Sequence, residues 1–198
     1  MGVEGPWLED GAMAVGPELI ARMDLEAPMS LGRRFDLVVC SEVAEHLSPN
    51  AAGILIDSLV AHGDYVLFSA AIPYQGGHHH VNEQFLSYWI EHFARHDYVV
   101  LDLFRARLWD DSSMLWWLRQ NLVLFVRRSV GEANPAFRDE LKVKRPVSIV
   151  LPGIYASRLE TAYQTIAEHN KLIAVIKDGG VFEVTKNVEN QLVNTRIA

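Results

Sequence analysis

Residues 35–47 read Phe-Asp-Leu-Val-Val-Cys-Ser-Glu-Val-Ala-Glu-His-Leu, and this stretch decides the fold that the sequence predicts. Its apolar run from Leu37 to Cys40 is short and rich in β-branched residues, which is typical of a strand buried on both faces in a parallel sheet. The polar or ionisable side chains that follow are Ser41, Glu42, Glu45 and His46. Ligands bind at the carboxyl ends of the strands in open α/β sheets, so we expect these side chains at a binding cleft.

The residues that follow this strand predict a helix and then a second strand. Residues 48–63 carry a helix start signal, apolar residues at helical spacing and a closing glycine. A second apolar run, Tyr65–Ile72, then ends at Pro73. Connections this short favour a right-handed unit with two parallel strands.

Two regions of the chain differ in character. Before residue 128 we expect a short helix over 17–23, a helix over about 83–96, and strands over 98–104 and 121–126. After it, residues 131–146 indicate a linker, 155–176 an amphipathic helix and 181–184 a short strand. We therefore predict an α/β domain over residues 1–128 and an extension with the amphipathic helix over residues 129–198.

Composition excludes some classes of function. The chain has 198 residues, enough for one domain with a sizeable core, and a formal net charge of −7, which disfavours nucleic-acid and anionic membrane partners. Neither a signal peptide nor an apolar run near the roughly 18 residues of a membrane span is visible, so we expect a cytoplasmic protein without membrane contact. The single cysteine, Cys40, lies in an apolar run and is expected to be a buried, inert thiol.

Residues 35–47 resemble the fourth-strand motif of class I S-adenosylmethionine-dependent methyltransferases. The similarity spans roughly residues 3–128 and includes the strand ending at Ala70–Pro73, the segment His79–Gln84 and the strand Asn121–Val126. It implies a Rossmann-like α/β fold with a doubly wound, mostly parallel sheet, to which the C-terminal helical extension predicted above is added. It also implies S-adenosylmethionine as cofactor, and methyl transfer to an oxygen or nitrogen of a small metabolite or glycan.

The family's glycine-rich first-strand motif has no counterpart before Val3, so the resemblance implies a sheet truncated at its N-terminus. The slot of that strand would be filled by the run Pro146–Leu151, by a partner subunit or by nothing. A different class of function is therefore also open. In it the chain is a non-catalytic methyltransferase remnant that serves as an interaction module and forms a homodimer through its C-terminal helix.

The resemblance assigns cofactor-binding roles to particular residues. In these enzymes an acid after the second strand binds the ribose, an acid–apolar pair holds the adenine, and residues after the fourth strand line the methionine end. The matching positions in this sequence are Glu4, Gly5, Asp24, Leu25, Ser41 and Glu42.

Catalytic chemistry is expected from Glu45, His46 and His80. A helical turn after the strand would place Glu42, Glu45 and His46 on one face. In one interpretation a histidine takes a proton from the substrate, because the imidazole pKa lies near neutral pH. In a second, a divalent metal is bound by the glutamate and histidine side chains, which resembles small-RNA 2′-O-methyltransferases. In a third, Glu45 and His46 only hydrogen-bond loop backbone.

Overall fold

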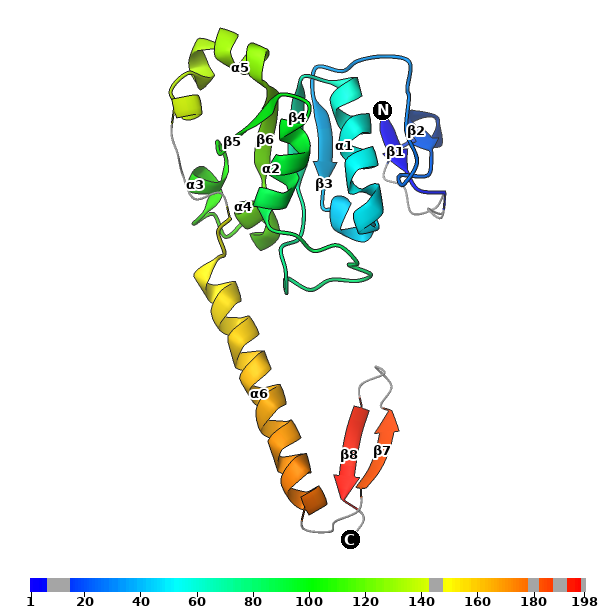
Figure 1. Cartoon of the computed structure of the whole chain (residues 1–198), viewed down its shortest axis with the longest axis vertical. Helices are drawn as coiled ribbons and strands as arrows, with labels where there is room; N and C mark the ends of the chain where they lie inside the picture. Colours follow the sequence, from blue (N-terminus) through cyan, green and yellow to red (C-terminus); the bar gives the residue numbers. More distant parts are fainter. Residues whose placement is uncertain (7–14, 143–147, 178–181, 187–191, 197–198) are drawn as a thin grey trace. The chain divides into compact units, whose positions relative to one another are not determined.

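The computed structural model describes residues 1–6, 15–142, 148–177, 182–186 and 192–196 (Figure 1). The chain divides into two compact units, Met1–Ile149 and Val150–Ala198. Among the described residues, no helix combines the length and the apolar character that crossing a membrane requires.

The first unit holds a two-stranded and a four-stranded sheet among its described residues. Strands β1 (Gly2–Glu4) and β2 (Ile20–Arg22) pair in parallel, and the larger sheet has the order β3-β4-β6-β5. Its strands are β3 (Val38–Ser41), β4 (Tyr65–Ser69), β5 (Tyr98–Leu101) and β6 (Val123–Arg127). The α-helices are α1 (Ala52–His62), α2 (Leu86–Ala94), α3 (Arg105–Leu108), α4 (Trp116–Asn121) and α5 (Arg128–Ala133). The 3-10 helices are η2 (Pro17–Leu19), η3 (Ala44–His46), η4 (Pro49–Ala51), η5 (Pro135–Phe137) and η6 (Glu140–Lys142).

The mixed α/β class with an open sheet and a C-terminal helix is confirmed, and in the larger sheet β3, β4 and β5 run in one direction while β6 runs in the opposite one. Only β3 and β4 pair in parallel in the four-stranded sheet, because β6 lies between β4 and β5 and runs antiparallel to both. Antiparallel neighbours need no long crossover. The segment between β5 and β6 contains only the short helices α3 and α4, so it returns at the same end of the sheet.

Strand β3 forms where the sequence predicts it, but its expected burial on both faces is wrong. Cys40 is buried, whereas Val39 is 59% exposed and Leu37 is 48% exposed. The reason is its place in the sheet: β3 hydrogen-bonds β4 on one side and is an edge of the four-stranded sheet. Side chains of alternate residues point to opposite faces, and only the face with Val38 and Cys40 packs against the core around α1.

A buried core lies between the sheet and helices α1 and α2, and aromatic rings form the part of it between α2, β4 and β6. The rings of Phe93 and Phe125 stack with their centroids 3.7 Å apart, and Phe68 contacts both of them and Trp89. All four side chains are buried. Helical spacing of the aromatic residues in α2 therefore signals core packing, although Phe85, just before this helix, is 44% exposed.

Several predicted element bounds change. The helix expected over residues 17–23 is wrong, because only Pro17–Leu19 is helical and Ile20–Arg22 pairs with β1 as a strand. The proposed linker contains α5, η5 and η6, although residues 143–147 lie outside the described part. Ser48 takes the N-cap position of η4, but its side chain makes no capping hydrogen bond. The run Pro146–Leu151 was one of three alternatives for the missing strand slot, and its described residues 148–151 form no strand.

The second unit contains the predicted long helix and a hairpin. Helix α6 (Pro152–Lys177) confirms the expectation for residues 155–176. Strand β7 (Phe182–Lys186) overlaps the predicted strand over 181–184, of which Val181 lies outside the described residues. It pairs antiparallel with β8 (Leu192–Arg196), which the sequence did not predict.

Candidate functional site

The carboxyl ends of the parallel strands β3 and β4 are joined by their polar residues. Ser41 Oγ lies 2.9 Å from Ser69 Oγ, and the Glu42 amide donates to the carbonyl oxygen of Ser69 over 2.9 Å. Glu42 itself adopts a left-handed backbone conformation with φ 51°, which is uncommon for a residue with a side chain. This conformation turns the chain out of the strand and begins the segment that carries the ionisable groups.

The turn after β3 is a short 3-10 helix, η3, and it contains Glu45 and His46 but not Glu42. The expectation that all three side chains share one helical face is therefore wrong. Glu42 instead accepts a hydrogen bond from Gln75 Nε2 at its Oε2, over 3.3 Å. The i, i+3, i+4 spacing places the three side chains on one face only if Glu42 is part of the same helical turn. Its left-handed backbone conformation takes Glu42 out of that turn.

Backbone hydrogen bonds bring the loop after β4 onto this turn. The carbonyl oxygen of Glu45 accepts from the amides of Val81 (2.9 Å) and Asn82 (3.0 Å). Within the loop, the Glu83 carboxylate accepts from the amides of Tyr74 and Gly76, each over 2.8 Å. Together these contacts place His80 beside η3, although the two segments are more than thirty positions apart in the sequence.

His80 and His46 meet edge to face, with ring centroids 4.8 Å apart. His80 Nδ1 lies 2.9 Å from Glu83 Oε1. An ionised carboxylate only accepts hydrogen bonds, so Nδ1 carries the proton and Nε2 is the nitrogen that a ligand would use. Desolvation and the neighbouring His80 lower the pKa of His46, which favours its neutral form near pH 7.

Glu45 is the unusual group of the site, because its carboxyl group is buried and neither oxygen has a hydrogen-bond partner among the described residues. Burial raises its pKa to about 7, and the charge of Glu42 adds to this shift. The backbone amides of Glu45 and Ala71 and the charge of His80 act in the opposite direction. Among the described residues, no amide meets hydrogen-bond geometry with the carboxyl group. Buried polar groups normally have partners, so this carboxyl group marks the turn as a functional candidate.

Glu45, His46 and His80 form the group of potential metal ligands within the described residues, and one ligand atom from each lies within 4.8 Å of the others. A carboxylate with two imidazoles suits Mn²⁺, Fe²⁺ or Mg²⁺ with additional water ligands better than a closed structural zinc site. The Glu83 carboxylate on the far nitrogen of His80 is the second contact that ligating histidines usually make.

A buried amide network beside the site was missed at the sequence level. Gln75 Oε1 accepts from Asn121 Nδ2 over 2.9 Å and from Gln120 Nε2 over 3.4 Å, and its own amide reaches Glu42. Gln75, Gln120 and Asn121 are all buried. The sequence contains one indication of this network. Gln120 and Asn121 stand directly before the apolar run of β6, and Gln75 lies in the loop after β4. Their hydrogen bonds connect the segment just before β6 to the carboxyl end of β3.

The predicted cofactor-binding residues fall into two groups. Glu4 is exposed and Gly5 buried at the end of β1, where the Glu4 carbonyl accepts from the Met23 amide. Asp24 is exposed, and its Oδ1 accepts from the Glu26 amide over 2.9 Å. Leu25 is buried in the core with α1 and the residues of η3. Ser41 and Glu42 form the second group, at the end of β3.

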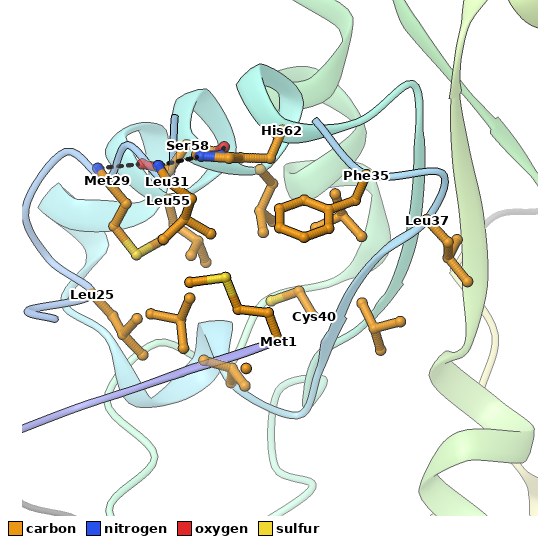
Figure 2. A pocket seen from close by; sticks show the side chains of 16 residues that line it. Met1, Leu25, Met29, Leu31, Phe35, Leu37, Cys40, Leu55, Ser58 and His62 are labelled. Carbon is orange, nitrogen blue, oxygen red and sulfur yellow. Dashed lines mark hydrogen bonds between the residues drawn. The ribbon is translucent and has the colours of Figure 1, made fainter. Parts of the chain in front are cut away.

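The larger described cavity is apolar (Figure 2), and the ionisable group is not part of its lining. It has a volume of about 170 Å³ and lies between the start of β1, the face of β3 and α1. Of the expected cofactor residues only Leu25 lines it, and Glu45, His46 and His80 do not. Pockets for drug-sized ligands measure about 300–1,000 Å³, so this cavity is small for a whole nucleoside cofactor.

Hydrogen bonds at the rim of this cavity fix the loop that follows β2. The Met29 amide donates to Ser58 Oγ over 3.1 Å, and the Leu31 amide donates to His62 Nε2 over 2.9 Å (Figure 2). His62 Nδ1 lies 2.6 Å from the Ser58 carbonyl oxygen and is therefore its donor. His62 consequently has a structural role, and none of the side chains that line the cavity is an acid, a lysine or an arginine.

Comparisons with known proteins do not add to this description: no family model, no curated protein and no solved structure matches the chain.

Proposed function

We propose that the first unit is a Rossmann-like methyltransferase domain that transfers a methyl group from S-adenosylmethionine to an oxygen or nitrogen of a small metabolite or glycan. One observation carries the proposal: Glu42, Glu45, His46 and His80 gather at the carboxyl ends of the parallel strands β3 and β4. In open α/β sheets this edge is where ligands bind.

The chemistry of methyl transfer suits these groups. The acceptor oxygen or nitrogen attacks the methyl carbon, the sulfonium leaves as a neutral thioether, and the acceptor loses a proton. His46 is suited to receive that proton, because its lowered pKa keeps the ring neutral near pH 7. The rest of the rate enhancement would come from holding the acceptor in line with the methyl group.

We assign the cofactor-binding residues the roles that the resemblance implies. Ser41 and Glu42 would face the methionine end, and Glu4, Gly5, Asp24 and Leu25 would hold the ribose and adenine. The small cavity beside Leu25 supports an apolar contact rather than a complete cofactor pocket. The proposal therefore depends on measured cofactor binding.

Calorimetric titration with S-adenosylmethionine and S-adenosylhomocysteine tests this proposal. We expect saturable binding of both, weakened by Glu42→Gln at the carboxyl end of β3. The matched control is Asp36→Asn, which removes an exposed carboxylate just before the same strand. Absence of heat up to millimolar ligand would exclude the methyltransferase and leave the non-catalytic interaction module.

A second candidate is a divalent-metal centre that orients the acceptor hydroxyl in metal-assisted methyl transfer. The buried carboxyl group of Glu45, which lacks a hydrogen-bond partner and stands with two imidazoles within 4.8 Å, favours it. Glu45, His46 and His80 would hold the ion, and the ion would supply positive charge near the attacking oxygen.

Thermal unfolding with and without Mn²⁺, after treatment with a chelator, tests the metal centre independently of activity. Binding to the folded state alone raises the melting temperature with metal concentration. We expect this shift to disappear in His80→Asn and to persist in His79→Asn, which changes the exposed neighbouring histidine. An unchanged melting temperature of the unmodified protein would exclude this centre.

A further inference from the structure

Helix α6 exposes large apolar side chains along its length. These are Tyr155, Leu159, Tyr163, Ile166, Ile173 and Ile176, each at least 38% exposed. Single exposed apolar residues are ordinary, but an exposed row on one element marks an interaction surface. At 26 residues the helix is about 39 Å long, so the row is long enough for an extended contact.

The spacing of this row is that of a coiled coil. Leu159, Ile166 and Ile173 are seven residues apart. Tyr155, Ala162, His169 and Ile176 form a second seven-residue series that alternates with the first at steps of four and three. These two series are the a and d positions of a heptad repeat, and we call them together the α6 seam. A repeat of 3.5 residues keeps one seam facing a partner helix only when the two helices wind around each other.

The positions on both sides of the seam favour a copy of the same helix as the partner. The e and g positions contain no acidic residue, and their two cations, Arg158 and Lys177, stand near opposite ends of the helix. A parallel second copy would therefore bring no cation against another in the middle of the contact. The acids Glu160 and Glu168 lie at b and c positions, away from the seam. A seam with a 3.5-residue repeat needs a partner helix of the same period, and α6 itself has it.

We infer that α6 pairs with α6 of a second copy of this chain, in a parallel two-stranded coiled coil through the α6 seam. Two of the three a positions, Ile166 and Ile173, are isoleucine, the type of residue that parallel two-stranded coiled coils favour there. Ala162 leaves room for close approach of the helices, and His169 is the one polar residue at the a and d positions. A polar residue in such a seam fixes the alignment of the two helices and weakens the pairing.

Sedimentation equilibrium of the full chain measures this pairing. We expect a mass of two chains that dissociates on dilution. Ile166→Asp places a charge at the middle a position and should give a single chain, whereas Ala167→Asp places the same charge at the adjacent b position and should leave the dimer. Circular dichroism of both variants verifies that the helices of the first unit remain.

A variant that dimerises more tightly provides a second test, because unfolding of the variant could not cause tighter dimerisation. His169→Leu replaces the polar residue in the seam, and we expect a dimer dissociation constant lower by roughly tenfold. Ala162→Cys in both chains should allow a disulfide across the parallel seam. A single chain at every concentration, equal loss of the dimer in both aspartate variants, or no disulfide at position 162 would overturn the inference.

Discussion

Strands β3 and β4 lie side by side as the parallel pair of the four-stranded sheet (Figure 1), and both begin as apolar runs, yet their environments differ. Val66 and Phe68 of β4 have no exposed surface, whereas Val39 of β3 is 59% exposed. The difference comes from the sheet order, in which β4 has two neighbours and β3 has one. Burial of a strand thus depends on its neighbours as much as on its own residues.

The carboxyl groups next to these strands differ in burial in the reverse sense: the acid beside the enclosed strand is partly exposed, and the acid beside the edge strand is buried. Asp64, just before β4, accepts hydrogen bonds from Arg34 and Arg127, each over 2.6 Å, and the bond from Arg127 is the main cause of its lowered pKa. Glu45, just after β3, has no hydrogen-bond partner for its oxygens among the described residues, and burial raises its pKa to about 7. The enclosed strand therefore follows a solvated, paired acid, and the edge strand precedes a buried, unpaired one.

Phe68→Ala should have the largest effect on the comparison between the strands. Phe68 contacts Trp89, Phe93 and Phe125, so its removal leaves a cavity in the aromatic core. We expect the free energy of unfolding to fall by about 3–5 kcal/mol, measured by urea denaturation followed by circular dichroism. A loss below about 1 kcal/mol would show that β4 is not the centre of the core.

Glu45→Gln should stabilise the metal-free protein at alkaline pH. A folded-state pKa of about 7 against 4.5 means that the folded protein binds more protons in this interval, so stability falls as the pH rises through it. Glutamine does not titrate, so the stability of the variant does not fall for this reason. In the presence of a chelator we expect it to be more stable by on the order of 2 kcal/mol at about pH 8, and similar to the unmodified protein at about pH 4. A less stable variant at pH 8 would contradict the raised pKa.

Asp64→Asn should show a smaller pH dependence of opposite sign. A lowered folded-state pKa contributes stability above the unfolded-state value and loses it as the pH falls through the folded-state value. Because the Asp64 side chain is 36% exposed, solvent screens the pairs, and we expect a loss below about 1 kcal/mol at neutral pH. Urea denaturation at neutral and acidic pH measures it. An equal loss at pH 3 would mean that charge is not involved.

Val39→Ala should have the smallest effect. The side chain is exposed, so we expect a change in the free energy of unfolding within about 0.5 kcal/mol. The matched control is Val66→Ala, the same substitution in β4, with an expected loss of about 1.5–3 kcal/mol. Equal losses for the two variants in thermal unfolding would show that the two strands are equally enclosed.

Much of the fold follows from local pattern. Apolar runs predicted β3, β4 and β6, and helical spacing predicted α1, α2 and α6, because each pattern is set by the period of one element. Exposure of Val39 was not predictable in this way, since it depends on which strands become neighbours. The antiparallel place of β6 between β4 and β5 is likewise a property of the chain path rather than of the residues of β6.

The candidate site was predictable in kind but not in geometry. Glu45, His46 and His80 were expected together because their side chains suit acid–base catalysis or metal binding. Left-handed backbone at Glu42 removed it from the helical turn, and no spacing rule predicts that conformation for a glutamate. The amides of Gln75, Gln120 and Asn121 meet only after the sheet forms, so their network has no local signature.

The paired amides on the carbonyl oxygen of Glu45 have a dynamic consequence. Val81 and Asn82 both donate to this one acceptor, so the loop carrying His80 and the turn carrying Glu45 separate only when both bonds open. Once the intrinsic exchange rate of each amide is taken into account, the two should therefore show the same opening free energy, set by one opening event rather than by two independent ones. That shared free energy reports how stably the ionisable group of the first unit is assembled.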